Sequence, residues 1–176
     1  GDLLGAERAV TAALALLVAA LVWRYAPAQP LLYLALPLWM LLRMALNAVD
    51  GMLAREFGQQ SALGAYLNEV CDVVADAALY LSLLSVPGAQ AAWLWLLAWA
   101  AALSEYAGVL GLMVGASRRY DGPMGKSDRA FVIGLAGVLL AGGWLAASVL
   151  NVLVAAMAGL CLWTLVNRVR RGLAEA

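Results

Sequence analysis

Two groups of oxygen-bearing side chains interrupt an otherwise apolar sequence. The first group is Asn47 and Asp50, and the second follows at four-residue intervals as Asn68, Asp72 and Asp76. Residues three or four apart share one face of an α-helix, so each group predicts a polar stripe on a helix. An Asp at the centre of a membrane helix costs about 2.5 to 3.5 kcal/mol on insertion scales, so clustered carboxylates indicate a cation or a polar ligand that meets them.

The two stripes are close enough in sequence to face each other. If the eight residues Glu56 to Leu63 form a tight turn, the flanking helices are antiparallel neighbours near one membrane surface. Hard oxygen donors would then converge from two helices, as Mg²⁺ or Mn²⁺ requires. The predicted metal ligands are Asp50, Asn47, Asn68 and Asp72.

The spacing of this stretch resembles the signature of the CDP-alcohol phosphotransferases, D-x-x-D-G-x-x-A-R-x(8)-G-x-x-x-D-x-x-x-D. Every interval of the signature is kept, and six of the eight fixed positions match at Asp50, Gly51, Ala54, Arg55, Gly64 and Asp72. Asn47 and Asn68 stand where the family has its first and third aspartates. The resemblance covers most of the chain and points to a bacterial inner-membrane branch of the family.

The resemblance implies roles for the matching residues. Asp72 would be the catalytic general base that takes a proton from the attacking hydroxyl. Gly51, Ala54 and Arg55 would bind the CDP moiety, because the two small residues let a nucleotide approach the backbone and Arg55 can meet a phosphate. Plain helix packing and a membrane-surface anchor are the alternative interpretations of these three residues.

The two asparagines remove two formal negative charges from the predicted metal site. We therefore expect one divalent ion to bind tightly and a second weakly or not at all, with Glu69 or Asp76 as possible compensating ligands. A catalytically impaired relative that still binds a CDP-linked lipid is the alternative that these substitutions raise.

A basic segment follows further along, and its residues 122–129 resemble the segment before the fifth helix in this family. Lys126 and Arg129 are predicted to bind an anionic group on the acceptor alcohol or on lipid. Retention of the segment in the cytoplasm is the alternative role of its charges. Two further charges, Arg43 and Glu105, either line the cavity or pair with each other or with another helix.

The composition indicates a polytopic membrane protein. Of the 176 residues, 65% are hydrophobic and 12% charged, about half the charge of a soluble domain. The chain has no histidine, which excludes a Ser-His-Asp triad and a histidine metal site. Cys71 and Cys161 lie in apolar segments and are expected to be free thiols.

Hydropathy predicts an all-α fold with six transmembrane helices in one domain, residues 1–176. The expected spans are Arg8 to Trp23, Leu31 to Arg55, Ala62 to Val86, Ala91 to Gly115, Arg129 to Trp144, and Ala147 to Val166. Proline, glycine and a polar loop separate them. The family resemblance adds a polar cavity that faces the cytoplasm and a homodimer.

Basic residues gather on one side of the six predicted spans. Nine lysines and arginines fall on that side and only Arg24 on the other, so both termini are expected in the cytoplasm of a bacterial inner membrane. The segment 1–7 is too short for the amphipathic helix that often precedes the first span in this family, so we expect that helix to be missing.

The expected function is phosphatidyl transfer in phospholipid biosynthesis. The resemblance implies a CDP-linked lipid as donor, with CDP-diacylglycerol as the expected lipid, an unidentified alcohol as acceptor, membrane lipid as environment, Mg²⁺ or Mn²⁺ as cofactor, and no nucleic acid. The inverse arrangement, in which CDP carries a small polar alcohol, stays open. An ion-coupled transporter is a different class of function that intramembrane carboxylates can mark, although no inverted repeat supports it.

Overall fold

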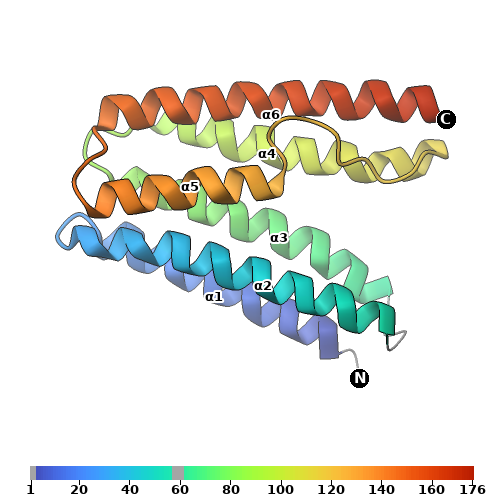
Figure 1. Cartoon of the computed structure of the whole chain (residues 1–176), viewed down its shortest axis with the longest axis horizontal. Helices are drawn as coiled ribbons and strands as arrows, with labels where there is room; N and C mark the ends of the chain where they lie inside the picture. Colours follow the sequence, from blue (N-terminus) through green and yellow to red (C-terminus); the bar gives the residue numbers. More distant parts are fainter. Residues whose placement is uncertain (1–2, 57–61) are drawn as a thin grey trace.

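The computed structural model describes the backbone of residues 3–56 and 62–176 and the side chains of residues 7–46 and 62–176. Its long helices are α1 (Leu3–Tyr25), α2 (Ala35–Glu56), α3 (Ala62–Ser82), α4 (Ala91–Leu110), α5 (Lys126–Ala141) and α6 (Ala147–Glu175). The helices run along the long axis of one bundle, and the N- and C-terminal ends lie at the same end of it (Figure 1). The all-helical prediction is confirmed for the described residues.

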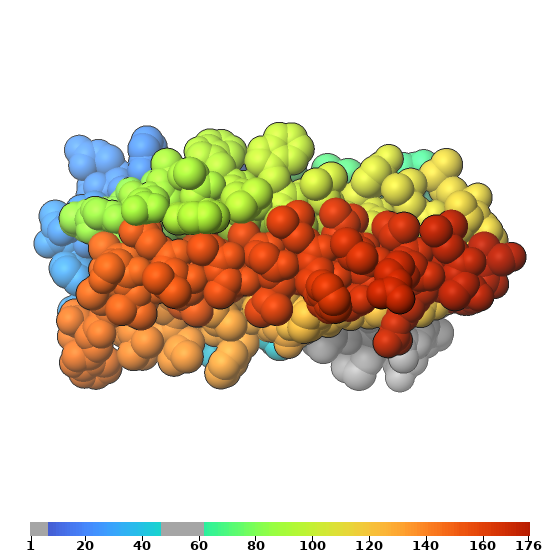
Figure 2. Space-filling model, turned by 90° about the horizontal axis from the view of Figure 1, so that it is seen from above, coloured from blue at the N-terminus to red at the C-terminus, as the bar shows by residue number. Residues whose placement is uncertain are grey.

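The bundle is built from three well-packed helix pairs, α1 with α3, α4 with α6, and α2 with α5. Contacts between α3 and α4 join the first pair to the second. Figure 2 shows α6 running along one whole face of the molecule with α4 beside it. Ion pairs join α5 to α3 and α4 and also join α6 to α4, so these four helices meet around a shared interior.

Most helix boundaries differ by a few residues from the hydropathy prediction, and two of the differences have consequences for the fold. The second apolar segment begins with a short 3₁₀ turn, η1 (Pro30–Leu34), before α2 starts at Ala35. Pro37 then lies in the first turn of α2, where a missing N–H breaks no intrahelical hydrogen bond. The last helix continues past its apolar segment to Glu175, and Arg168 on this extension donates to the carbonyls of Asp121 and Ser104.

The apolar side chains divide between a packed interior and the outer surface. Leu36, Leu79, Leu97 and Ile133 are fully buried at the centre of the core. Large apolar side chains such as Trp99, with 64% of its surface exposed, cover the outside. An apolar outer surface over helices of this length is what a lipid bilayer requires.

By length and composition, three described helical segments are apolar enough to cross a membrane, namely Glu7–Tyr25, Ala91–Val114 and Ala147–Glu175. The segment Pro30–Leu46 is a shorter apolar helix. The protein is thus a membrane protein with transmembrane helices, while the count of six spans stays a prediction.

A glycine permits the close approach of α5 to the start of α2. A Cβ atom added at Gly137 would lie 2.7 Å from the carbonyl oxygen of Tyr33 and 2.9 Å from Cδ of Pro37. The backbone of η1 therefore contacts α5 at a distance that only glycine allows.

Replacing this glycine should loosen the α2–α5 pair. We expect Gly137→Ala to cost about 1 to 3 kcal/mol of stability, the usual range for overpacking, and to lower the midpoint of thermal unfolding in detergent. Gly159→Ala is the matched control, because a Cβ at Gly159 on α6 meets no atom within 4 Å. Equal midpoints for the two variants would contradict the close contact.

Candidate functional site

A polar cavity of about 540 Å³ lies among α1, α3, α4, α5 and α6. Its cationic lining residues are Arg8, Arg118, Lys126 and Arg168. Its anionic lining residues are Asp72, Glu105 and Asp128. Because Arg8 lies near the start of the chain and Arg168 near its end, the cavity belongs to the end of the bundle where the termini lie (Figure 1).

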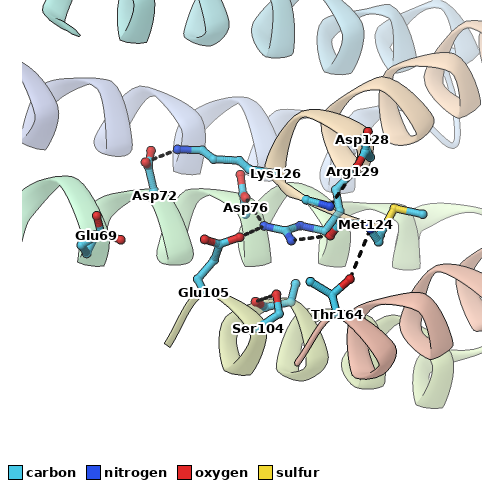
Figure 3. A network of polar contacts seen from close by, with 12 residues as sticks. Glu69, Asp72, Asp76, Ser104, Glu105, Met124, Lys126, Asp128, Arg129 and Thr164 are labelled. Carbon is cyan, nitrogen blue, oxygen red and sulfur yellow. Dashed lines mark hydrogen bonds and ion pairs between the residues drawn. The ribbon is translucent and has the colours of Figure 1, made fainter. Parts of the chain in front are cut away.

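The loop between α4 and α5 forms part of the cavity wall and is fastened to α6. Met124 N donates to Oγ1 of Thr164 at 3.3 Å, a contact drawn in Figure 3. Gly122 has φ +125°, and a Cβ there would lie 2.5 Å from Cγ2 of Thr164, so the chain needs glycine at this point for two reasons.

Asp121 gives the same loop an electrostatic attachment to α6. Its carboxylate accepts from Arg119 at 2.8 Å and from Arg171 at 2.9 Å, and its carbonyl accepts from Arg168 at 3.2 Å. The hydrogen bond from Arg119 is the main reason that the pKa of Asp121 lies below its ordinary value. The loop is therefore anchored at pH 7 by an ionised Asp121.

The predicted general base lies on the cavity wall. Asp72, on α3, accepts a hydrogen bond at Oδ2 from Nζ of Lys126 at the start of α5 (Figure 3). The Asp72 side chain is 22% exposed and that of Lys126 is 30% exposed, so both remain within reach of a molecule in the cavity. The fold has thus brought together two of the residues that the sequence singled out.

One helical turn before Asp72, Asn68 also contacts a cation. Its Oδ1 accepts from Nη1 of Arg8, and its Nδ2 donates to Oε1 of Glu69 at 3.2 Å. Helix α1 therefore contributes a guanidinium to the polar stripe of α3.

Glu105 on α4 is the point where three arginines converge. Arg129 donates to Oε1 at 2.9 Å, while Oε2 lies 3.3 Å from Arg168 and 3.9 Å from Arg118. Arg168 also donates to the carbonyl of Ser104. The carboxylate of Glu105 thereby links α5, α6 and the loop before α5 to α4.

A second acidic residue extends this network away from the cavity. Asp76 on α3 is 4% exposed; it accepts a hydrogen bond from Arg43 of α2 and lies 3.6 Å from Arg129. Arg129 is fully buried and also donates to the hydroxyl of Tyr80 and the carbonyl of Met124, both at 3.0 Å. Each buried charge of this chain of contacts meets an opposite one, as burial requires.

Arg118 closes the cavity on its α3 side. It forms a two-pronged contact with Glu69, with 2.8 Å between Nη2 and Oε2, and its guanidinium lies 4.9 Å from the ring centre of Tyr120. Partial burial opposes the charge of Arg118, but the hydrogen bonds that it donates to Glu69 and its attraction to the charges of Glu69 and Glu105 together raise the pKa of Arg118 above its ordinary value.

The predicted site residues fall into three groups. Asn68, Asp72 and Lys126 line the cavity. Arg129 lies behind Glu105, outside the main lining, so its binding to an acceptor stays a prediction. The third group lies on α2, in the part of that helix whose side chains the structure does not describe. Its members are Asn47, Asp50, Gly51, Ala54 and Arg55.

Among the described side chains no cluster of three or more His, Cys, Asp or Glu residues is placed to hold a metal ion. The donors that the described part supplies are the oxygens of Asn68 and Asp72, one helical turn apart on α3. Oxygen donors suit Mg²⁺ and Mn²⁺, so the chemistry of these residues fits such an ion once Asp50 is added from α2.

Several cavity residues were not assigned a site role from the sequence. Arg8, Arg118 and Arg168 entered only as basic residues that mark one membrane side, since nothing in their spacing identifies partners far away in the chain. The pairing of Arg43 and Glu105 with other helices is confirmed, whereas a pair between these two residues is not formed. Asp76 is the partner of Arg43. The sequence feature that could have indicated this pairing is the four-residue spacing that puts Asp76 on the same face of α3 as Asp72.

Removing one buried carboxylate tests the network. We expect Asp76→Asn to cost about 3 to 5 kcal/mol of stability, because Arg43 and Arg129 lose a charged partner inside the bundle. Thermal unfolding in detergent measures the loss. Glu175→Gln is the control. Glu175 also pairs with an arginine, Arg119, but its side chain is 40% exposed, so this variant should change the midpoint little. A midpoint for Asp76→Asn as high as that of the control would refute the structural role.

Comparison with known proteins identifies the family. Residues 7–166 match the sequence model described as CDP-alcohol phosphatidyltransferase. The inner membrane protein YnbA of Escherichia coli strain K12 is 46% identical over 145 residues, which are 81% of this chain and 71% of that protein. No solved structure matches the chain. The predicted resemblance is confirmed, and this chain belongs to the CDP-alcohol phosphatidyltransferase family of membrane transferases.

Proposed function

We propose that this chain transfers a phosphatidyl or other substituted phosphoryl group from a CDP-alcohol to an acceptor hydroxyl and releases CMP. The donor that fits best is CDP-diacylglycerol, because its tails can stay in the bilayer while its diphosphate enters a polar cavity. The observation that carries the proposal is Asp72 on the wall of a cavity of about 540 Å³ in a membrane protein of this family.

Asp72 is the proposed general base. Its Oδ2 is held by Lys126, and Oδ1 is the oxygen that would accept the proton of the acceptor hydroxyl. The acceptor oxygen then forms a bond to the lipid-side phosphorus as the bond from that phosphorus to the oxygen of CMP breaks. The proton stays on Asp72 until solvent takes it, and CMP leaves with the electron pair of the broken bond.

The donor is proposed to lie between α2 and α3. Gly51, Ala54 and Arg55 bind its CDP moiety, and Asp50, Asn47, Asn68 and Asp72 are the proposed ligands of Mg²⁺ or Mn²⁺. Such an ion, when bound, neutralises charge on the diphosphate. The family as a whole supports this assignment through its shared use of CDP-linked substrates.

Cationic side chains favour an acceptor that carries an anionic group. Lys126, Arg118 and Arg168 line the cavity from α5, the loop before α5 and α6, so an anionic group in the cavity would meet cations from three elements. Arg129 is fully buried behind Glu105, and we propose that it affects acceptor binding indirectly. It holds Glu105, which in turn contacts Arg118 and Arg168 in the cavity wall.

The same proposal sets the protein in its membrane. The nine basic residues of one side, the related inner membrane protein and the shared end of the two termini support a multi-pass inner-membrane protein with both termini in the cytoplasm. A homodimer is proposed from the family alone.

CMP release tests the transferase directly. Purified protein in lipid, given CDP-diacylglycerol, Mg²⁺ or Mn²⁺ and a panel of alcohols with and without a phosphate group, should release CMP with one acceptor. Asp72→Asn should reduce the rate at least about 100-fold, the contribution typical of a general base, while CDP still binds.

Two outcomes of this assay would count against the proposal. Full activity of Asp72→Asn would refute the base assignment. CDP binding without CMP from any acceptor would favour a CDP-lipid-binding pseudoenzyme, with Asn47 and Asn68 as the physical cause.

Lys126 provides a test of the acceptor side. We expect Lys126→Gln to raise the KM for the acceptor about tenfold or more and to change the KM for CDP-diacylglycerol little, because one charged contact to an anionic group is lost. Arg170→Gln removes one charge from an exposed position of α6 and is the matched control. An unchanged acceptor KM in Lys126→Gln would rule out the contact.

A further inference from the structure

Position 68 presents its oxygen to an arginine. The single side-chain oxygen of Asn68 accepts from Nη1 of Arg8, and the amide nitrogen is turned to Glu69 at 3.2 Å. At the position where the family signature has a metal-binding carboxylate, this chain therefore pairs a neutral amide with a cation from α1.

Arg8 reaches the place where α2 and α3 approach each other. Besides the main cavity, it lines a small cavity of about 20 Å³ whose wall includes Arg43 and Leu46 of α2 and Asn68, Cys71 and Asp72 of α3. Helices α2 and α3, which carry the two halves of the family signature, thus both border the space beside Arg8. No other residue of α1 that is charged lines either cavity in the described part of the chain.

The charge of this contact depends on the residue at position 68. An aspartate there would place a negative charge beside the guanidinium of Arg8, whereas the amide accepts the hydrogen bond without adding a charge. The next position of the stripe, Asp72, is likewise met by a cation, Lys126 from α5. The α3 stripe is contacted by protein cations at the two positions where the signature would place acidic residues.

We propose that Arg8 binds the diphosphate of the CDP-linked donor and takes the place of one of the two divalent ions that the full aspartate pattern would hold. This inference rests on the proposed function, because the donor class comes from it. A guanidinium presents donors in a planar fork that matches two oxygens of a phosphate group. The chain would then work with one divalent ion, for which Asn47, Asp50 and Asp72 remain as ligands because the oxygen of Asn68 is taken by Arg8, and with Arg8 as a permanent cation.

This arrangement accounts for the asparagine at position 68. Two missing carboxylates would leave a second divalent ion with too little negative charge around it, and the same loss makes room for a positively charged side chain. The exchange of Asp for Asn at position 68 and the presence of Arg8 beside it are therefore two parts of one change in the site.

Binding measurements test the proposal without turnover. Electron paramagnetic resonance counts Mn²⁺ bound per chain in the presence of CDP, and calorimetry gives the Kd of CDP at fixed Mn²⁺. The wild-type chain should hold one Mn²⁺. Arg8→Gln should weaken CDP binding about tenfold or more at the same Mn²⁺ count. Arg24→Gln is the control, because Arg24 lies at the other end of α1 against the ring of Tyr25, at 5.3 Å, and should bind CDP like the wild type.

Restoring the carboxylate separates a site role from a folding role. Arg8→Gln combined with Asn68→Asp should bind two Mn²⁺ and regain CDP affinity, whereas Asn68→Asp alone should stay at one, since the new carboxylate then pairs with Arg8. Two Mn²⁺ in the wild type, or an unchanged Kd of CDP in Arg8→Gln, would overturn the proposal. So would two Mn²⁺ in Asn68→Asp alone, a result that needs no variant of Arg8 to fold.

The outcomes distinguish this inference from the proposed function. An Arg8-dependent Kd of CDP with no CMP release from any acceptor would sink the transferase proposal and leave the role of Arg8 standing. CMP release with a Kd that does not depend on Arg8 would do the reverse. A wild-type chain that does not bind CDP would overturn both.

Discussion

The buried ion pairs that run from α2 to α6 are the constraint on which the rest of the structure depends. Arg43, Asp76, Arg129, Glu105 and Arg168 come from five different helices, and four of them are no more than 4% exposed. A charge left alone in such surroundings costs several kcal/mol, so each helix must be placed where its charge finds an opposite one. Apolar packing between alanine- and leucine-rich helices would permit many sliding arrangements, and the ion pairs select one.

The cavity is a consequence of the same pairs. Glu105 is shared between Arg129 on its buried side and Arg168 and Arg118 on its cavity side, so the cavity wall is also part of the helix-joining network. The loop before α5 is attached to α6 through Met124 and Asp121, and the α5 that follows it presents Lys126 to Asp72. Groups that hold the bundle together and groups that face the cavity are therefore in direct contact.

The sequence predicted the helices well because hydropathy and breaker residues act locally. It placed Asn68 and Asp72 on one helix face for the same reason, as four-residue spacing fixes direction without knowledge of the fold. It did not identify Arg8 or Arg118 as cavity residues, since their partners Asn68 and Glu69 lie 60 and 49 positions away and are brought close only by helix packing. Arg43 shows the limit most clearly: the need for a partner followed from burial, but the choice of Asp76 over Glu105 depends on which helix lies beside α2.

The paired state of the cavity charges affects how any variant must be interpreted. Asp72 is a proposed base, yet it is also the partner of Lys126, and Lys126 begins α5, whose fourth residue is the buried Arg129. A substitution at either position therefore changes a contact with substrate and a contact that positions α5. Because both effects reach the site, a fall in activity identifies a functional group only when the thermal midpoint and the affinity for the other substrate are unchanged. The membrane setting makes this coupling unavoidable, since a charge that serves a reaction there must also have a partner while the site is empty.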